Sequence, residues 1–330
     1  MIERLAKRQF GSSSLMVPPI AVGCAPMGSM SDTFGYAVSE ADAVETIKTA
    51  LAGPINYIDT AALYGDGVSE QRIGKALAEL GGLPAGAVLQ TKQGRDPQTN
   101  DYSGETVRRR MARSLELLGV DHVDAVYLHD AEWTTFSEAM APGGPVEALV
   151  EFKTQGVFDY LGVAAGPNEV ELQYIETGLF DAVITHNRYT LLNQNANPVI
   201  DAAHERGMAV LNAAPYGSGI LVRGPEAYPR YAYHQASEAM IERTTALREI
   251  CDRYGVPLAA AALQFSTLDP RIDVTIVGMS HPDRLDQTIA FATVEIPDDC
   301  WTEIRALPQL PAHNPEAGRY EEALPYQQEG

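Results

Sequence analysis

Four polar side chains whose chemistry suits proton transfer stand at the ends of short apolar runs. Asp59 and Tyr64 lie five positions apart in NYIDTAALYG, Lys92 ends AVLQTK, and His129 ends AVYLH. A tyrosine with its ordinary pKa of ~10 is a poor base at neutral pH. A lysine ammonium beside it favours the phenolate, and a carboxylate keeps that lysine charged and oriented. We therefore expect Asp59 to pair with Lys92, and Lys92 to lower the pKa of Tyr64 to about 7 to 9. His129 would hydrogen-bond the oxygen that exchanges the proton.

Each of these residues, taken singly, also has an ordinary structural explanation. An aspartate at a strand end often caps a turn, and a tyrosine in a glycine-rich loop often only packs. A lone lysine is usually solvated, and a lone histidine is usually a hydrogen-bonded core residue. Together, at the ends of three consecutive apolar runs, the four residues favour a single reactive site over four coincidences.

The elements that must position these residues alternate between strands and helices. Eight short apolar runs read as strands: PPIAVGCA, NYIDTAA, AVLQTKQG, VDAVYLHD, YLGVAAG, DAVITHN, MAVLNAAP and VTIVGMS. Stretches of helical period predict helices at 40–52, 69–80, 105–118, 145–155, 168–177, 197–206, 237–254 and 282–292. The strand runs are apolar on both faces, as in a parallel sheet covered on both sides. The pattern predicts the α/β class and a closed (β/α)8 TIM barrel, in which polar residues at the strand ends face one cavity.

Signals at the helix ends and three segments outside the repeat complete the predicted organisation. Ser39 precedes the first helix as an N-cap, and glycines that suit left-handed C-caps follow four helices, namely Gly53, Gly81, Gly156 and Gly178. Residues 1–17 predict a small N-terminal hairpin, 216–236 a long loop after strand seven, and 294–330 a tail with one short helix around Asp298–Leu307. No change of composition marks a linker, so residues 1–330 are predicted to be a single domain with a barrel core at about 18–292.

The composition narrows the class of partner. The 330 residues include 44 acidic and 24 basic side chains, a net charge of −20, which opposes binding to nucleic acid or to an anionic membrane surface. The three cysteines lie far apart and are odd in number, which fits a reducing cytoplasm better than a disulfide framework. The N-terminus is too charged for a signal peptide. No apolar run approaches the ~20 residues of a membrane span. We expect a cytoplasmic protein that binds a small molecule and no metal, with a homo-oligomer left open.

Three segments carry a resemblance to a known family. NYIDTAALYGDGVSEQRIGKAL, LQTKQG and VYLHD resemble the signature segments of the aldo-keto reductase superfamily, and the resemblance runs from about residue 8 to 310. It implies a (β/α)8 barrel, a nicotinamide dinucleotide bound without a Rossmann domain, and hydride transfer at a carbonyl carbon. The absence of GxGxxG after the first strand agrees with this. The resemblance implies catalytic roles for four residues: Asp59, Tyr64, Lys92 and His129.

Two further segments, NRYTLLNQ (187–194) and NAAPYGSGIL (212–221), resemble one branch of that superfamily. The branch contains D-threo-aldose 1-dehydrogenase, L-fucose dehydrogenase, L-galactose dehydrogenase and pyridoxal 4-dehydrogenase. It implies oxidation of a cyclic hemiacetal to a lactone with NAD(P)+, the hemiacetal being that of an aldose or of pyridoxal. Two alternatives stay open: an NADPH-dependent aldehyde or ketone reductase, and a cofactor-binding regulatory subunit without activity.

The same resemblance implies where the cofactor binds. Small residues in YGSGIL would let backbone amides approach the pyrophosphate, with a plain glycine turn as the alternative; the residues are Tyr216, Gly217, Ser218 and Gly219. The segment VGMSHPDRLDQT matches the adenosine-binding segment: Gly278, Met279, Ser280, Arg284 and Gln287. The Ser-Asn pair that often grips the carboxamide is replaced by Ala164 and Ala165, and the nicotinamide-stacking aromatic by Ala213, for which Tyr216 could compensate. His186, Asn187 or Asn168 would then hold the carboxamide.

Cofactor preference and substrate contacts follow from the same loops. The segment after strand eight has no Arg or Lys before Arg284 to hold a 2′-phosphate, so the sequence predicts NAD over NADP by a ratio of ten or more in kcat/KM. Aromatic residues that either line a substrate pocket or stabilise the long loop are Trp133, Tyr228, Tyr231 and Tyr233.

Overall fold

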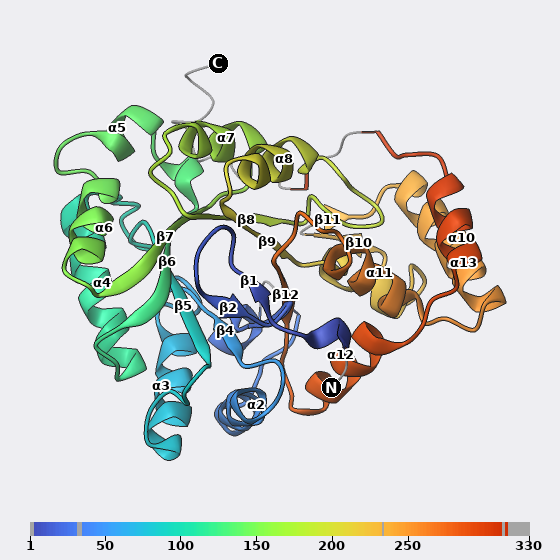
Figure 1. The fold of residues 1–330 in the computed structure, drawn as a ribbon, viewed down its shortest axis with the longest axis horizontal. Helices are drawn as coiled ribbons and strands as arrows, with labels where there is room; N and C mark the ends of the chain where they lie inside the picture. The colour runs from blue at the N-terminus through green and yellow to red at the C-terminus, as the bar shows by residue number, and fades with distance from the viewer. Residues whose placement is uncertain (1–2, 32–34, 233, 312–313, 316–330) are drawn as a thin grey trace.

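Eight parallel strands close into a barrel (Figure 1). The computed structural model describes residues 3–31, 35–232, 234–311 and 314–315. The strands follow the closed order β12-β3-β4-β5-β6-β7-β8-β9. Their bounds are β3 (Ile20–Gly23), β4 (Tyr57–Asp59), β5 (Val88–Gln93), β6 (Val123–His129), β7 (Phe158–Ala164), β8 (Ala182–His186), β9 (Ala209–Ala213) and β12 (Val274–Gly278). The predicted (β/α)8 barrel is confirmed.

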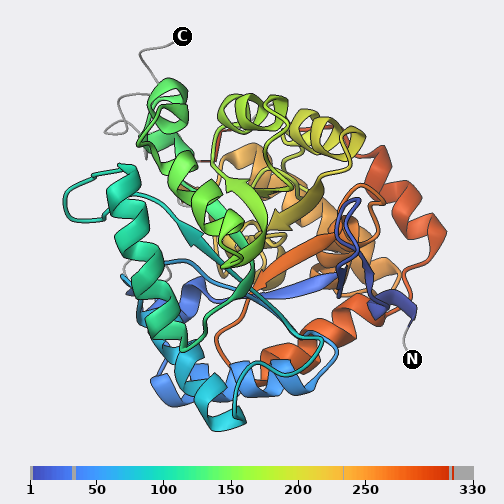
Figure 2. The same ribbon diagram turned by 60° about the vertical axis from the view of Figure 1, so that its left-hand side comes forward.

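Helices surround the barrel (Figure 2). Those near the predicted ranges are α2 (Glu40–Ala52), α3 (Val68–Leu80), α4 (Gly104–Leu118), α6 (Pro145–Thr154), α7 (Asn168–Glu176), α8 (Asn197–Glu205), α10 (Glu238–Arg253) and α12 (Asp283–Thr293). The predicted cap of α2 is confirmed, since Ser39 accepts a hydrogen bond from the amide of Asp42. Three of the four predicted glycines are left-handed, but Gly53 has φ −105°. Gly53 ends α2 in an extended conformation, so its predicted left-handed cap is wrong.

The seventh strand-helix unit differs from the prediction. Helix α10 packs on α11 (Leu258–Thr267) and on α13 (Asp298–Ala306), whereas α11 contacts α12 and the barrel strand β12. The sequence LAAAALQFST of α11 is buried on almost all sides. A helix that is buried on almost all sides lacks the contrast between an apolar and a polar face on which sequence reasoning depends. For this reason α11 was missed, and α10 was wrongly expected to take its place.

A small hairpin covers the N-terminal end of the barrel. Strands β1 (Arg8–Gln9) and β2 (Met16–Val17) pair antiparallel, as predicted, after the short η1 (Glu3–Leu5). Phe10 between them is buried with side chains of the barrel interior. Gly11 has φ +54°, and a Cβ at this position would lie 2.6 Å from the amide nitrogen of Ala209. This close approach requires glycine and fixes the hairpin against the barrel.

Two further predicted segments are the long loop after β9 and the C-terminal tail. The long loop contains η4 (Gly217–Gly219), α9 (Ile220–Arg223), β10 (Arg230–Tyr231) and β11 (His234–Gln235), while Tyr233 lies outside the described residues. The predicted tail helix is present as α13, and Asn314 beyond it accepts a hydrogen bond of 3.1 Å from Arg188. Residues 316–330 of the predicted tail lie outside the described part of the chain.

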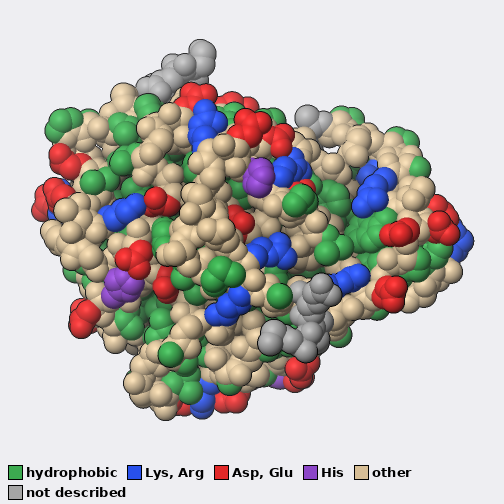
Figure 3. Space-filling view, in the orientation of Figure 1, with side chains coloured by type: hydrophobic (Ala, Val, Ile, Leu, Met, Phe, Trp, Pro, Cys, Tyr) green, Lys and Arg blue, Asp and Glu red, His purple; other side chains and the backbone are tan. Residues whose placement is uncertain are grey.

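The remaining short helices connect strands to helices at the barrel ends. They are η2 (Ala25–Gly28) after β3, and η3 (Ala131–Trp133) and α5 (Phe136–Met140) after β6. No helix within the described residues is long and apolar enough to cross a membrane. On the face shown in Figure 3, acidic and basic side chains are interspersed with apolar and neutral ones.

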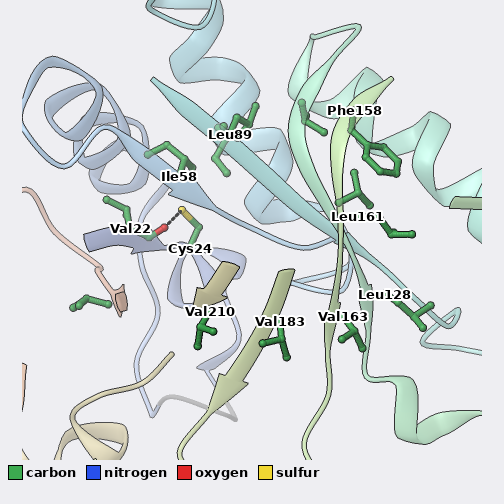
Figure 4. Close-up of a cluster of buried hydrophobic side chains, with 14 of the residues drawn as sticks. Val22, Cys24, Ile58, Leu89, Leu128, Phe158, Leu161, Val163, Val183 and Val210 are labelled. Carbon is green, nitrogen blue, oxygen red and sulfur yellow. Dashed lines mark hydrogen bonds between the residues drawn. The ribbon is translucent and has the colours of Figure 1, made fainter. Parts of the chain in front are cut away.

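The two faces of the barrel strands differ in character. On the outer face, apolar side chains such as Ile58, Leu89 and Leu128 pack in a layer with those of the surrounding helices (Figure 4). Successive side chains of a strand point to opposite faces, so the next residue along each of these strands points into the barrel. These inward residues are Asp59, Gln90 and His129, and Lys92 follows Gln90 on the same face. The strands therefore bring the predicted polar residues to one interior.

Candidate active site

A buried ion pair forms the base of the site. Asp59 ends β4 and Lys92 lies near the end of β5, and Lys92 Nζ is 2.6 Å from Asp59 Oδ1. Both side chains are less than 5% exposed, at 4% and 3%. Lys92 Nζ also donates to the carbonyl oxygen of Thr60 at 2.8 Å. Because a buried charge is costly unless it is paired and hydrogen-bonded, Asp59 keeps Lys92 charged at this position.

Tyr64 is connected to this ion pair by a hydrogen bond from Lys92. Its hydroxyl oxygen accepts a hydrogen bond of 3.1 Å from Lys92 Nζ. The loop that carries Tyr64 is held by close backbone contact, since a Cβ at Gly65 would lie 1.9 Å from the carbonyl oxygen of Gly28. The tyrosine ring stays partly exposed, whereas Lys92 does not. The chain Asp59–Lys92–Tyr64 thus leads from the barrel interior to a half-buried tyrosine, with the contacts of Lys92 to Asp59 and Tyr64 that the sequence predicts.

His129 stands beside this phenol at the end of β6. The imidazole and the Tyr64 ring meet edge to face, with centroids 5.8 Å apart and planes at 86°. His129 Nε2 lies 3.4 Å from Asp130 Oδ1, and the backbone carbonyl of His129 accepts a hydrogen bond from the hydroxyl of Tyr102. Its Nδ1 is buried without a hydrogen-bond partner among the described residues. All four residues predicted to form a proton-transfer site, Asp59, Tyr64, Lys92 and His129, are therefore brought together.

Burial decides the protonation states of the site. It raises the pKa of Tyr64 to about 12, because desolvation outweighs the lowering by Lys92, and Asp59 adds to the rise. Burial opposes the charge of Lys92, but Asp59 and Tyr64 raise its pKa above the ordinary value. Burial also lowers the pKa of His129 to about 4. The predicted lowering of the Tyr64 pKa to about 7 to 9 is therefore wrong for the protein alone. At neutral pH the site holds a phenol, an ammonium and a neutral imidazole.

A cavity of 620 Å³ lies between the loop after β9 and the segment after β12. Seven of the ten predicted cofactor residues line it: Tyr216, Ser218, Gly219, Gly278, Ser280, Arg284 and Gln287. Met279 is fully buried, so its side chain belongs to the core and not to the cavity wall. Gly217 is buried in the same loop, and His186 ends β8, where its charge would act on His129. The cavity wall is thus separate from the four residues of the proton-transfer site.

The glycine-rich loop beside the cavity has an unusual backbone. Ala214, Gly217, Ser218 and Gly219 all have positive φ. A Cβ at Gly217 would lie 2.6 Å from the ring of Tyr231, so only glycine fits there. The amides of Gly217 and Gly219 donate within the loop, to the carbonyls of Ala214 and Tyr216 at 3.1 and 3.0 Å. These two amides are therefore not directed at a ligand, whereas the exposed Ser218 places a hydroxyl-bearing side chain on the cavity wall.

Three arginines line the cavity, where the sequence predicted one. Arg284 from α12 is joined by Arg223 and Arg230 from the long loop. Arg284 donates to Gln287 at 2.6 Å, and the Arg223 guanidinium lies over the Tyr228 ring at 5.3 Å. The premise that Arg284 is the single cation here is wrong, because the folded long loop returns to the segment after β12. Tyr36, from the loop after β3, also lines the cavity and was missed. The rule that loops after all strands meet at one barrel mouth could have indicated it.

Orphaned polar atoms test whether a dinucleotide fits. Ala164 and Ala165 are buried and offer no hydrogen-bonding side chain. Among the described residues, Asn187 Oδ1, Asn168 Oδ1 and the Tyr216 hydroxyl are buried without a hydrogen-bond partner. A nicotinamide carboxamide carries N–H donors that would satisfy such acceptors. The residues present therefore fit the group. Trp133, also expected near the substrate, stacks under the Arg95 guanidinium at 3.8 Å.

Comparison with known proteins agrees with this site. The family model described as Aldo/keto reductase family matches residues 19–309. The chain is 30% identical to pyridoxal 4-dehydrogenase of Microbacterium luteolum, covering 91% of this chain and 96% of that protein. It is 29% identical to D-threo-aldose 1-dehydrogenase of a Pseudomonas species, covering 91% and 97%. It is also 29% identical to L-galactose dehydrogenase of Arabidopsis thaliana, covering 88% and 89%.

Solved structures show the same fold. An aldo-keto reductase of Bacillus halodurans in its holo form superposes with a TM-score of 0.76 at 23% identity, covering 94% of this chain and 98% of that one. The family model and the curated relatives confirm the predicted resemblance. With a closed barrel, a matching family model over most of its length and dehydrogenases among its relatives, the chain belongs to the aldo/keto reductase family and is an oxidoreductase.

Proposed function

We propose that this protein oxidises the cyclic hemiacetal of a small aldose, or of pyridoxal, to the lactone with NAD(P)+. The observation that carries the proposal is the chain Asp59–Lys92–Tyr64, which ends in a partly exposed phenol beside a neutral histidine. Relatives at about 30% identity are named for aldose, galactose and pyridoxal dehydrogenation. Since a hemiacetal already holds its ring oxygen, its oxidation needs no added water.

The four residues have distinct tasks in this reaction. Tyr64 takes the proton of the anomeric hydroxyl, and Lys92 stabilises the phenolate that accepts it. Asp59 keeps Lys92 charged and directed at Tyr64. His129 is neutral, so it orients the anomeric oxygen by a hydrogen bond without adding a charge. The bound dinucleotide supplies the hydride acceptor.

The cofactor would be held by the cavity next to this site. We propose that Ser218 and the arginines of the wall contact its phosphates, and that Gln287 contacts the adenine. His186, Asn187 or Asn168 would hold the carboxamide. We propose NAD+ as the preferred cofactor, but with Arg223 and Arg230 beside Arg284 the preference should be less than tenfold in kcat/KM.

One observation favours a second candidate, the reduction of an aldehyde with NADPH. Burial raises the pKa of Tyr64 to about 12, so the phenol is protonated at neutral pH and suited to donate a proton to a carbonyl oxygen. Oxidation uses the phenolate and therefore becomes faster as the pH rises. The two candidates move the hydride and the proton in opposite directions on different substrates, and they differ in the pH at which each is fast.

A single set of assays tests both directions. Purified protein is mixed with NAD+ or NADP+ and with L-fucose, L-galactose, D-arabinose, L-xylose or pyridoxal, and NAD(P)H formation is followed at pH 7 and pH 9. We expect formation with at least one of these compounds, faster at pH 9. NADPH consumption with simple aldehydes at pH 7, together with no oxidation of any panel compound, would favour the reductase. No turnover in either direction would contradict both candidates.

A further inference from the structure

The barrel interior carries a second polar layer beneath the proton-transfer site. Tyr57, Gln90 and Tyr127 each lie two positions before a residue of that site on β4, β5 and β6, so they point to the same interior face. All three side chains are completely buried. Barrel interiors of this kind are usually filled by branched apolar side chains. Three polar side chains at these positions therefore require a physical reason.

Hydrogen bonds connect two members of this layer, Tyr57 and Gln90, to Asp59. The strand register places Gln90 directly beside Asp59 on the neighbouring strand. Gln90 Nε2 donates to Asp59 Oδ1 at 2.6 Å, and the Tyr57 hydroxyl donates to Gln90 Oε1 at 2.5 Å. An ionised carboxylate only accepts hydrogen bonds, so the amide nitrogen must face Asp59 and the amide oxygen must face Tyr57. The orientation of the buried amide is thus fixed at both of its ends.

The bond from Gln90 falls on the oxygen that also binds Lys92. Asp59 Oδ1 receives Gln90 Nε2 and Lys92 Nζ, both at 2.6 Å. We propose that Gln90 is a positioning residue for the reaction: it holds the Asp59 carboxylate and disperses its charge, so that Lys92 stays directed at Tyr64. The proposal rests on the proposed function, because it concerns the proton transfer at Tyr64.

Loss of the Gln90 donor has a defined direction. The negative charge of Asp59 raises the pKa of Tyr64. In the wild type, Lys92 Nζ lies 3.1 Å from the Tyr64 hydroxyl. Without Gln90 the charge of Asp59 is less dispersed, so Lys92 Nζ is drawn toward Asp59 and away from that hydroxyl. Both changes disfavour the phenolate. The rise of the oxidation rate with pH should therefore begin at higher pH.

The variant Gln90→Met keeps the length of the side chain and removes both hydrogen bonds. A hydrogen bond to a charged group is typically worth a factor of about 10 to 100. We expect kcat at pH 8 to fall by about tenfold, with little change in KM, and the alkaline limb to move up by about 0.5 to 1 pH unit. The variant Tyr57→Phe, which removes only the hydroxyl that orients the amide, should move the limb in the same direction by less.

Gln93 offers a matched control on the same strand. It is as completely buried as Gln90 and donates to Ser114 Oγ at 2.8 Å, but it lies on the outer face, toward α4. We expect Gln93→Met to lower the melting temperature about as much as Gln90→Met while leaving the pH profile of kcat unchanged. Equal pH profiles for Gln90→Met, Gln93→Met and the wild type would show that Gln90 is merely structural.

A measurement that does not depend on enzymatic turnover tests the role of Gln90 independently of the proposed function. If the wild type oxidises no compound of the panel, the proposed function fails, and nuclear magnetic resonance of protein labelled with [13Cζ]tyrosine decides the role of Gln90. The Tyr64 resonance is assigned by its disappearance in Tyr64→Phe. Its ionisation should begin at higher pH in Gln90→Met than in the wild type and in Gln93→Met. An unchanged onset would overturn the proposal.

Discussion

The proton-transfer site and the neighbouring cavity are built in opposite ways. Three residues of the first lie on the strands β4, β5 and β6, and Tyr64 lies in the loop after β4; Lys92 is held by three partners and is 3% exposed. The second is formed largely by loops and helix ends, and its three arginines are exposed. Strands hold side chains at hydrogen-bonding distance from one another, which proton transfer requires. Loops instead provide a surface that a long ligand can contact at many points.

The two regions also differ in how strongly their charges act. Around Tyr64, burial removes water, so neighbouring charges and desolvation move pKa values far from their ordinary range. At the cavity wall, water and salt screen the arginines, and each contact with a phosphate should be worth little alone. Substitutions in the first region should therefore change rate and pH dependence strongly, and those in the second should change affinity modestly.

The largest effect is expected from Tyr64→Phe. Phenylalanine keeps the ring but removes the group that moves the proton, so kcat should fall by about 10²–10⁴-fold. Binding of NADH, measured by fluorescence, should persist because the cavity is a separate region. Tyr254→Phe, which removes a hydroxyl bonded to Glu303 at 2.6 Å, is the control and should keep normal turnover. Retention of more than about a tenth of kcat in Tyr64→Phe would exclude Tyr64 as the acid–base residue.

The next effect is expected from Lys92→Met. The cation that opposes the rise in the Tyr64 pKa is then gone, so the alkaline limb of oxidation should move up by at least about one pH unit. In the wild type the rate should rise throughout pH 7 to 10 without a plateau, since burial raises the pKa of Tyr64 to about 12. Lys75→Met, at an exposed ion pair with Glu40, is the control. If the Lys92→Met enzyme were active and the alkaline limb of its pH profile were unshifted, Lys92 would not control the pKa of Tyr64.

A smaller effect concerns stability in acid. Burial lowers the pKa of His129 to about 4, whereas in the unfolded chain it has its ordinary value of about 6.5. The unfolded state therefore binds the proton first, and the stabilisation present above pH 6.5 is lost as the pH falls toward 4. Between pH 7 and pH 5 the loss should be about 2 kcal/mol in the free energy of unfolding.

The variant His129→Gln isolates this contribution. Chemical denaturation at pH 7 and pH 5 should show a smaller difference between the two pH values for His129→Gln than for the wild type. His122→Gln is the matched control, because the His122 side chain is 45% exposed. If His129→Gln and His122→Gln had the same pH dependence as the wild type, His129 would not be the buried neutral group described above.

The smallest effect is expected at the cavity. Arg284→Gln removes one of three arginines on the wall, so kcat/KM with NADP+ should fall by less than tenfold while kcat with NAD+ stays unchanged. In the wild type, the ratio of kcat/KM with NAD+ to kcat/KM with NADP+ should itself be below ten. Arg305→Gln, at an arginine stacked on Trp301, is the control. A strict requirement for NADP+, abolished in Arg284→Gln, would show a dedicated phosphate site and contradict the proposed preference.

Pattern and chemistry together predicted which four residues meet in the candidate site, but they missed several residues around it. Asp59, Tyr64, Lys92 and His129 could be found because each follows a recognisable apolar run. Gln90 could not be assigned a role, because its importance lies in facing Asp59 across two strands. Arg223 and Arg230 were missed because the path of the long loop has no local signal in the sequence. Helix α11 was missed because burial on almost every side removes the polar-apolar period that marks a surface helix.

Local sequence patterns predicted the order of the eight barrel strands, most of the helices between them, the closed barrel, and the residue types at the strand ends. Those follow from local periodicity and from side-chain chemistry, which are properties of short segments. Only the tertiary structure decided the sign of the Tyr64 pKa shift and the number of cations at the cavity. Desolvation depends on everything that surrounds a group, and the meeting of distant loops depends on the whole fold.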